Sequence, residues 1–277
     1  MNYLENALHI ARLSDTGKLR LRNEDSIASD SSIGLALLAD GMGGYNAGDV
    51  ASQMAALTIT AELKTCFKNA FDSGHCIDAT NASAHIIDAV NAANKAILQV
   101  SHEQAQCAGM GTTLVLGLFI DNQVIVGHIG DSRAYRFRDQ ALQQITNDHS
   151  LLQEQLDSGL LTPEQAKFAT YKNFVTKALG IEAVADLELN TYDTLVGDIY
   201  LLCSDGLSDM LEHEEIESIL TESKGKLEHA ANALVQKANL HGGKDNISVI
   251  LIEVVQKFSL KKSTWYKNIL KKVVDKG

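Results

Sequence analysis

Four aspartates of this chain share one local setting, an apolar run with glycine near the acid. Asp40, Asp131 and Asp205 each follow such a run, whereas Asp245 precedes the run that begins at Ile247. A carboxylate at the tip of a buried strand loses hydration unless a positive charge meets it. If the four tips converge, they would hold a hard divalent cation, because Mg²⁺ and Mn²⁺ prefer carboxylate and carbonyl oxygens.

An aspartate beside glycine has a second interpretation as an ordinary turn, which for any single pair is the commoner one. The acid pair Glu24-Asp25 adds a fifth candidate, so coincidence becomes a weaker explanation for the whole set. The neighbouring glycines would let the backbone turn sharply and bring a carbonyl close to an ion. The chemistry that follows is metal-activated water attacking an electrophile such as phosphorus.

Several other phosphoryl- and acyl-transfer sites are excluded by the sequence. A GxxxxGK[ST] phosphate-binding loop is absent, because Asp245 follows Gly243-Lys244. A GxSxG nucleophile elbow around Ser204 fails at Leu202. None of the four cysteines has an arginine six residues later, which excludes cysteine-based phosphate chemistry, and none forms a CxxC pair.

The composition describes an acidic chain, in which 277 residues carry 35 Asp and Glu against 24 Lys and Arg, a net charge of −11. Such a chain repels the phosphate backbone, so we expect no nucleic acid among its partners. No basic start followed by an apolar run marks a signal peptide, and no stretch approaches the ~20 apolar residues of a membrane span. We therefore expect a cytoplasmic protein with free thiols.

The elements that must position the acids are predicted from apolar alternation, β-branched runs and alanine-rich stretches. Asp121-Asn122, between two apolar runs, is a candidate hairpin turn. Strands come in consecutive runs with helices in blocks between them, which favours an α+β fold of antiparallel sheets covered by helices. The strands are expected near 6–13, 34–39, 112–120, 123–130, 133–138, 142–146, 187–193, 198–204 and 247–255, and the helices near 48–68, 78–106, 213–222 and 227–240.

The predicted organisation is one domain over residues 1–256, with a flap-like insertion at about 150–180, followed by a tail at 257–277. The tail contains seven lysines and one acid, hence +6, which leaves −17 on the rest of the chain. A helix over 264–276 would gather six apolar residues on one face: Trp265, Tyr266, Ile269, Leu270, Val273 and Val274. Three partners for this helix stay open: the chain's own acidic body, an anionic membrane surface bound weakly, or another protein.

Seven short motifs occur in an order that resembles the metal-dependent protein phosphatases, the type 2C serine/threonine phosphatases, in their bacterial form. The resemblance covers about residues 5–255 and implies an αββα sandwich, two antiparallel sheets flanked by helices. The motifs are Arg20-Leu-Arg-Asn-Glu24-Asp25, Asp40-Gly-Met-Gly-Gly44, Gly111-Thr-Thr113, Gly130-Asp-Ser-Arg133, Asp148-His-Ser150, Ser204-Asp-Gly206 and Gly243-Lys-Asp-Asn246.

Carried onto this sequence, the resemblance implies a centre of two Mn²⁺ or Mg²⁺ ions. Asp40 would bridge the two ions. Asp205 and Asp245 would complete the protein ligands of the first ion. Glu24, together with the carbonyl of Gly41, would serve the second.

The resemblance also implies a third, weaker ion and a phosphate-binding arginine. Asp131 and Asp209 match the positions that hold the third ion in similar enzymes. Arg20, four residues before Glu24, matches the arginine that grips the substrate phosphate, and a guanidinium offers paired donors for that purpose. Arg22 is the rival, but Arg20 has the family spacing.

Other residues near the motifs are expected to support the site. Met42 stands where many eukaryotic members have a histidine proposed as general acid, although many bacterial members share this methionine. The proton for the leaving group must then come from water, a metal ligand or another side chain. His128 and His149 are expected to be hydrogen-bonded structural histidines. A second group is expected to be supporting or structural: Asn246, Asp25, Asp148 and Thr113.

The resemblance implies an active enzyme that hydrolyses phosphoserine and phosphothreonine in phosphorylated proteins and opposes a bacterial Ser/Thr kinase. The alternative is a protein of the same fold that binds phosphoproteins without hydrolysing them, and the loss of a ligand carboxylate would mark it. All four side-chain ligands are acids, which favours the enzyme: Glu24, Asp40, Asp205 and Asp245. A two-metal nuclease is disfavoured, because the acidic body lacks a basic track for nucleic acid.

Overall fold

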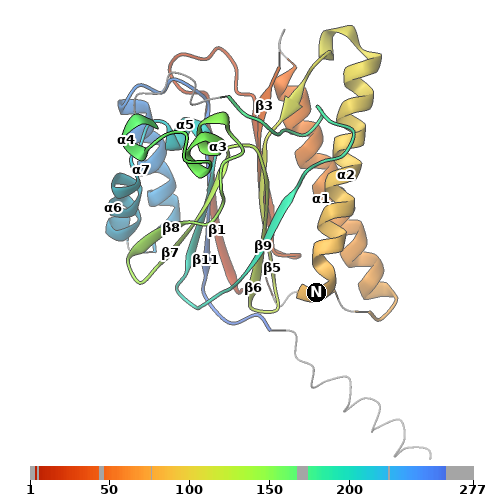
Figure 1. The fold of residues 1–277 in the computed structure, drawn as a ribbon. Helices are drawn as coiled ribbons and strands as arrows, with labels where there is room; N and C mark the ends of the chain where they lie inside the picture. Colours follow the sequence, from red (N-terminus) through yellow and green to blue (C-terminus); the bar gives the residue numbers. More distant parts are fainter. Residues whose placement is uncertain are drawn as a thin grey trace, which may run out of the picture.

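The computed structural model describes residues 4, 6–43, 47–75, 77–166, 174–223 and 225–259. Two antiparallel sheets lie face to face, and helices cover the outer face of each sheet (Figure 1). The predicted α+β fold, an αββα sandwich, is confirmed. The predicted tail helix at 264–276 lies outside the described residues.

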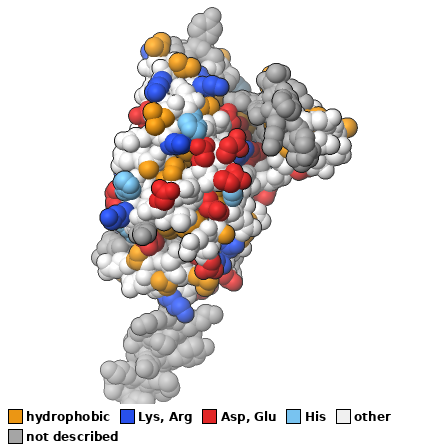
Figure 2. Space-filling view, turned by 90° about the vertical axis from the view of Figure 1, so that its left-hand side faces the viewer, with side chains coloured by type: hydrophobic (Ala, Val, Ile, Leu, Met, Phe, Trp, Pro, Cys, Tyr) orange, Lys and Arg blue, Asp and Glu red, His pale blue; other side chains and the backbone are white. Residues whose placement is uncertain are grey.

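In the first sheet, the first and the last strand of the chain lie side by side. Its outer face is covered by α6 (His213–Ser223) and α7 (Leu227–Leu240), whose own surface carries several acidic side chains (Figure 2). The strands in spatial order are β1 (Leu8–Asp15), β11 (Ile247–Val254), β10 (Ile199–Cys203), β7 (Arg133–Arg138) and β8 (Ala141–Gln144).

The second sheet is covered by two long helices, α1 (Gly48–Asp72) and α2 (Ala79–Glu103), the second of which leads into the short 3₁₀ helix η1 (Ala105–Cys107). Among the described residues, no helix is both long enough and apolar enough to cross a membrane. The strands in spatial order are β2 (Asp25–Asp30), β3 (Leu35–Met42), β5 (Leu114–Ile120), β6 (Gln123–Ile129) and β9 (Glu188–Asp193), and the two-residue β4 (Gly111–Thr112) pairs with the end of β3.

Apolar side chains fill the three interfaces of the sandwich. Ala51, Ala55 and Ile59 repeat at helical spacing on the buried face of α1. Between the two sheets, the rings of Phe119 and Tyr200 meet edge to face with centroids 5.3 Å apart. Because β5 lies between a helical layer and the opposite sheet, all of its residues are buried, and its sequence is a continuous apolar run.

The strand that the sequence pattern did not predict is β2. Its sequence, Asp-Ser-Ile-Ala-Ser-Asp, has two apolar residues, and each of its side chains is only partly buried, so it carries little alternation. Pairing with β3 defines it, with Asp25 opposite Asp40 and Asp30 opposite Leu35. The missed strand therefore places Asp25 beside the central acid of the predicted cluster.

The turn between β5 and β6 confirms the predicted hairpin at Asp121-Asn122. Both residues have positive φ, 52° and 59°, the combination that a type I′ turn requires. The Asn122 side chain also accepts the backbone N–H of Phe258 at 2.7 Å. Phe258 is only 2% exposed, and its ring packs against Phe119. The packed body therefore includes Phe258, two residues beyond the domain end expected at 256.

The insertion expected at 150–180 contains two short helices, α3 (Leu151–Asp157) and α4 (Pro163–Ala166), while residues 167–173 lie outside the described part of the chain. Leu179, at its end, exchanges backbone hydrogen bonds with Thr112 of β4 at 3.0 and 2.8 Å. Because β4 pairs with the end of β3, the insertion returns to the sandwich beside Asp40.

Candidate metal centre

Asp40 lies near the end of β3, in the middle of the predicted cluster of acids. The antiparallel register places Asp25 of β2 directly opposite it. Just beyond this pair, the N–H of Gly41 donates to the carbonyl of Glu24 at 3.1 Å. A β-carbon on Gly41 would collide with the backbone of Gly48, so glycine here allows α1 to approach the strand end. Local pairing thus brings three acids to one edge.

Asn246 joins the loop before β2 to the loop before β11. Its buried amide Nδ2 donates to the carbonyls of Thr16 and Arg22, both at 2.9 Å. Its Oδ1 accepts the backbone N–H of Glu24 at 2.8 Å. One side chain therefore fixes the backbone that carries Glu24 and holds it next to Asp245, the residue that precedes Asn246.

Two hydroxyl groups connect the end of β3 to the loop that carries Asp131. Thr113 Oγ1 accepts the N–H of Asp40 at 3.1 Å and lies 2.8 Å from Ser132 Oγ. The N–H of Thr113 donates in turn to the Asp40 carbonyl at 2.9 Å. Gly130 has a φ of +101°, and a β-carbon there would press on the Thr113 side chain. The turn therefore needs glycine to bring Asp131 to the cluster.

Asp205 enters the cluster from the other sheet, as the first residue of the short helix α5 (Asp205–Ser208), which follows β10. Ser204, just before it, donates through Oγ to Asp25 Oδ2 at 2.9 Å and accepts the N–H of Ser248 at 3.0 Å. Gly206 packs against the backbone of Asn246, where a β-carbon would collide. These contacts hold the strand ends of both sheets together at the acids.

The carboxyl groups of the cluster raise one another's pKa. For Asp40, burial is the largest cause and the charges of Asp25 and Asp205 come next, so its pKa lies well above the usual range. Burial, followed by the charge of Asp131, raises the pKa of Asp205 in the same way. Burial is also the main cause that raises the pKa of Asp25 and of Asp131 to about 6 each. The acids that the sequence singled out are therefore electrostatic neighbours.

The cluster fits a divalent cation. Asp25 Oδ1 and Asp205 Oδ1 are buried and have no hydrogen-bond partner among the described residues. A buried oxygen without a donor costs roughly 1–3 kcal/mol, and repulsion between neighbouring carboxylates adds to that cost. A bound cation would remove both costs. The available ligands are carboxylate and carbonyl oxygens, which suit Mn²⁺ or Mg²⁺.

Arg20 lies at the rim of the cluster. Its Nη2 donates to Asp245 Oδ2 at 2.6 Å, and this bond is the main cause that raises the pKa of the guanidinium. The side chain is 52% exposed, so it faces both the acids and solvent. The pKa of Glu24 is raised by burial and by Asp49, and Arg20 opposes that rise more strongly than Arg22 does. The structure thus brings Arg20 closer to the acids than its rival.

Asp131 and Asp209 lie on the side of the cluster that adjoins Asp205. The N–H of Asp209 donates to the Asp205 carbonyl at 2.7 Å, and the Asp209 side chain is exposed. Burial, then the charges of Asp148 and Asp209, raise the pKa of Asp131. Asp148 is itself held by Arg133, whose Nε and Nη2 donate to it at 3.0 and 2.7 Å. Asp148 therefore has the supporting role expected for it.

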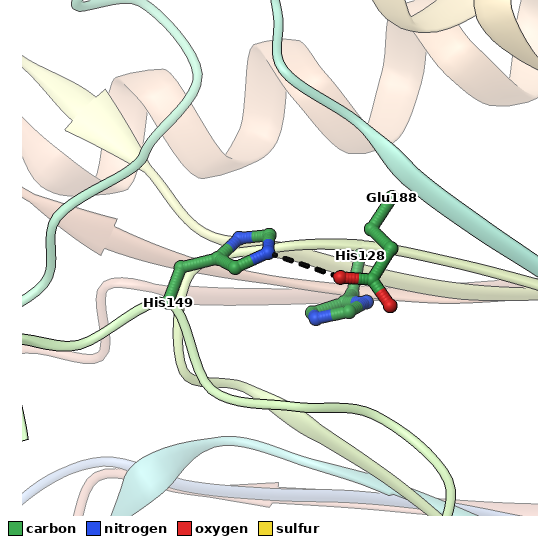
Figure 3. A group of neighbouring side chains, drawn as sticks. All are labelled: His128, His149 and Glu188. Atoms are coloured by element: carbon green, nitrogen blue, oxygen red, sulfur yellow. Dashed lines mark ion pairs between the residues drawn. The ribbon is translucent and has the colours of Figure 1, made fainter. Parts of the chain in front are cut away.

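A second group of ligand-type side chains consists of His128, His149 and Glu188, whose nearest atoms lie within 4.8 Å of one another (Figure 3). His149 Nδ1 accepts the N–H of Gly130 at 3.2 Å, so the neutral ring carries its proton on Nε2, facing Glu188 at 3.5 Å. His128 Nε2 donates to the carbonyl of Asn147 at 2.7 Å. A cation at this group would have to displace the Nε2 proton of His149.

The two rings are stacked, with centroids 4.6 Å apart. Burial, followed by the charge of His128, lowers the pKa of His149, so this ring is neutral at pH 7. Both rings are thus hydrogen-bonded supports behind Gly130, as expected from the sequence, and we do not assign a metal site to them.

Two residues at the site were not identified from the sequence. Asp49, in the first turn of α1, is the second cause after burial that raises the pKa of Glu24. It follows Gly48, so the search for acids beside glycine could have found it. Ser204 was noted only as part of a motif, because nothing in its neighbours indicates that its hydroxyl reaches Asp25 on the opposite sheet.

Comparison with known proteins gives consistent matches over most of the chain. A sequence model of the family described as "Protein phosphatase 2C" matches residues 18–241. The protein phosphatase PhpP of Streptococcus pneumoniae is 37% identical over 251 residues, which cover 89% of this chain and 98% of that protein. The serine/threonine phosphatase stp of Listeria monocytogenes serotype 4b is 35% identical over 249 residues, which cover 89% of this chain and 96% of that protein.

Solved structures show the same fold. The crystal structure of the Mycobacterium tuberculosis serine/threonine phosphatase PstP/Ppp is similar with a TM-score of 0.80 and 36% identity, over 90% of this chain and 99% of that one. A second structure, the catalytic domain of PstP in complex with two manganese ions, has a TM-score of 0.78 and 36% identity over the same shares. The family model includes the segments that carry Glu24, Asp40, Asp131, Asp205 and Asp209 and ends before Asp245.

Proposed function

Because this chain belongs to the protein phosphatase 2C family, it is a metal-dependent serine/threonine phosphatase, and we propose that the acids around Asp40 form its catalytic centre. The observation that carries this proposal is the buried Oδ1 of Asp205, which has no hydrogen-bond partner among the described residues and lies within a group of carboxyls that raise one another's pKa. Bound cations would stabilise such a group of carboxylates, and phosphate ester hydrolysis is the reaction of the family.

We assign the protein ligands as follows. Asp40 would be a ligand of both ions, in keeping with its central position and its register with β2. Asp205 and Asp245 would hold one ion, and Glu24 with the carbonyl of Gly41 would hold the other. Support comes from the two manganese ions in the PstP structure. Bound Mn²⁺ or Mg²⁺ supplies activation of water and neutralisation of negative charge on the phosphate.

A third, weaker ion is assigned to Asp131 and Asp209. Asp131 is buried beside Asp205, and Asp209 directly follows α5, one turn after Asp205. The exposed Asp209 side chain gives this position more contact with water than the other two. Water can replace the ion at an exposed carboxylate at a smaller cost in free energy than at a buried one. This ion is therefore expected to be the first that a chelator removes.

Arg20 is assigned to binding the substrate phosphate. Its guanidinium is already held at the rim by Asp245 and is half exposed, so an incoming phosphate dianion can reach the same side chain from solvent. Guanidinium groups bind phosphate oxygens through paired N–H donors. A substrate phosphate bound by Arg20 would therefore have its phosphorus oriented toward the cluster of acids before the reaction begins.

The insertion at 150–180 is assigned a role in selecting phosphoproteins. Its end is hydrogen-bonded to Thr112, whose hydroxyl donates to the Asp40 carbonyl at 2.8 Å, so it borders the acids. Exchanging the insertion for that of another family member should change the preference among phosphoproteins while turnover of a small aryl phosphate stays within about twofold. Equal effects on both substrates would contradict this role.

The natural substrates are phosphorylated proteins, and we assign to the enzyme a cognate Ser/Thr kinase whose products it removes. We place this reaction in the cytoplasm, where such kinases and their substrates meet. For the tail, contact with membranes is expected to be no more than weak, salt-dependent binding to anionic lipid, because six apolar residues give little insertion.

The experiment that tests the proposed function is phosphate release by metal-depleted protein, measured with phosphoserine and phosphothreonine peptides and an aryl phosphate. Activity should appear on addition of Mn²⁺ or Mg²⁺ and disappear with a chelator. Asp40→Asn should abolish it. Asp30→Asn is the matched control, because it makes the same change on the neighbouring strand β2 at an acid bound to Lys64. Full activity of Asp40→Asn at saturating Mn²⁺ would overturn the assignment.

A further inference from the structure

A groove of about 580 Å³ runs between α6 and α7 on the outer surface of the first sheet. Acidic side chains line it along the length of α6: Glu214, Glu215 and Glu222. Apolar groups lie between them, with Ile219 partly buried and Leu240 75% exposed. An exposed apolar strip with acids beside it is the complement of a basic amphipathic helix.

The charge of this surface is not balanced locally. The sequence of α6 contains four glutamates and neither lysine nor arginine. The lysine that lines the groove, Lys237, is already paired with Glu215 at 3.5 Å. Figure 2 shows this face of the molecule, with red acidic side chains gathered near its middle and few blue ones among them. The groove therefore presents a negative field to any approaching segment.

The tail of the same chain has the complementary character. Residues 257–277 carry +6, and a helix over 264–276 would place six apolar side chains on one face and lysines on the others. Thirteen helical residues span about 20 Å, whereas the eleven residues of α6 span about 17 Å. The length, charge and apolar face of this segment thus match those of the groove.

The tail leaves the body at the same end of the sandwich at which α7 begins. The body ends with Phe258, which is buried at the end of the sandwich close to the end of β11. At that same end, His9 lies 3.1 Å from Glu228 of α7 and 3.8 Å from Glu253 of β11, so the start of α7 and the end of β11 are neighbours. Residues 259–263, extended, can span roughly 17 Å. They have to pass the first sheet to reach its helical layer, because Phe258 packs between the two sheets.

From these observations we propose that the tail helix at 264–276 binds in the groove between α6 and α7 of its own chain. The lysines pair with the glutamates of α6, and the face that begins with Trp265 covers Ile219 and Leu240. The groove leads toward the loop at 242–245, because Leu240 ends α7 just before it. A tail bound in the groove would therefore lie beside the segment that carries Asp245, and it would not contact the proposed ligands.

The test uses Trp265, which is the single tryptophan of the chain, so tryptophan emission excited selectively over the seven tyrosines reports on the tail alone. The groove variants are Glu214→Lys with Glu222→Lys, and Leu240→Asp. The matched control is Glu62→Lys with Glu103→Lys, which makes the same change of charge on exposed positions of α1 and α2. Cooperative thermal unfolding and unchanged aryl phosphate turnover show that each variant is folded.

In the wild type and in the control, Trp265 emission should be blue-shifted and its acrylamide quenching constant severalfold lower than in either groove variant. Salt at about 1 M, where the Debye length is about 3 Å, should move the wild type toward the double-charge variant. Equal quenching in all variants would overturn the proposal. Protection that is lost on dilution, which indicates a second copy, would overturn it as well. So would protection that appears only with phosphatidylserine vesicles and equally in the groove variants.

Discussion

Replacing Asn246 by alanine should separate positioning of the centre from stability of the fold. The side chain makes three hydrogen bonds, to the carbonyls of Thr16 and Arg22 and from the N–H of Glu24. At about 1 kcal/mol net for each bond, the variant should lose roughly 2–4 kcal/mol of unfolding free energy. A protein of this size should then melt about 5–15 °C lower.

The same substitution should weaken metal binding, because Glu24 is a proposed ligand whose backbone depends on Asn246. Loss of a residue that orients a ligand typically weakens metal affinity by roughly 10–100-fold. The assay is a Mn²⁺ titration of aryl phosphate hydrolysis, together with calorimetric measurement of Mn²⁺ binding.

The chain offers a close control in Asn94 of α2, which is also buried. Its Oδ1 accepts the N–H of Gly180 at 2.7 Å, and its Nδ2 donates to the carbonyl of Glu182 at 2.9 Å, away from the acids. Asn94→Ala should lose a similar amount of stability and keep the wild-type affinity for Mn²⁺. If both variants retain that affinity, Asn246 contributes to the fold alone and the positioning argument is refuted.

Three further predictions follow from the same structure. Metal-depleted protein should be more stable at about pH 5 than at about pH 7.5, by on the order of 1–3 kcal/mol of unfolding free energy measured in urea. The reason is that the pKa of Asp25 and of Asp131 is about 6 in the folded state, so stability is lost as the pH rises from about 4 through about 6. Excess Mn²⁺ should remove this loss, and a stability that rises with pH would contradict the charge argument. Arg20→Ala should raise KM for phosphopeptides severalfold with little change in kcat, and a larger effect of Arg22→Ala would reverse the assignment. Ending the chain after residue 259 should lower the melting temperature by only a few degrees, because it removes the tail proposed to bind the folded body. Phe258→Ala should cost more, roughly 3–5 kcal/mol of unfolding free energy, and equal melting of the two proteins would show that Phe258 does not belong to the core.

Most strands were predictable because burial on both faces leaves a plain signature. The runs that became β3, β5, β6, β10 and β11 are nearly continuous apolar segments, since each lies between a helical layer and the other sheet. The edge strand β2 lacks that signature, because its residues are partly exposed and its pairing with β3 defines it. Edge strands of this kind depend on contacts that are remote in sequence, so a local pattern does not reveal them.

The candidate site was predictable to a similar degree. Acids beside glycine at the ends of apolar runs indicated Asp40, Asp131, Asp205 and Asp245 from residue chemistry alone, whereas Glu24, Gly41 and Arg20 received their roles from the family resemblance. The network between these residues was not predictable. The bond from Ser204 to Asp25 joins residues 179 positions apart, and that from Asn246 to Glu24 joins residues 222 apart. Only the closed sandwich brings such partners together.

The way the fold holds these acids links catalysis to stability. Three uncharged side chains hold the acids in place through hydrogen bonds: Asn246, Thr113 and Ser204. Because these side chains are uncharged, they position the carboxylates without cancelling their charge. Arg20 donates a hydrogen bond to the proposed ligand Asp245 at the rim, whereas Arg133 and Arg22 act on Asp131 and Glu24 through their charge alone. The remaining repulsion is therefore carried by the folded state until cations bind, and the energy that cations gain by relieving it adds to their affinity. A tighter neutral network would raise stability, whereas an added internal cation would stabilise the metal-free fold at the expense of metal binding. The arrangement found here keeps the centre rigid and leaves its charge for the ions to satisfy.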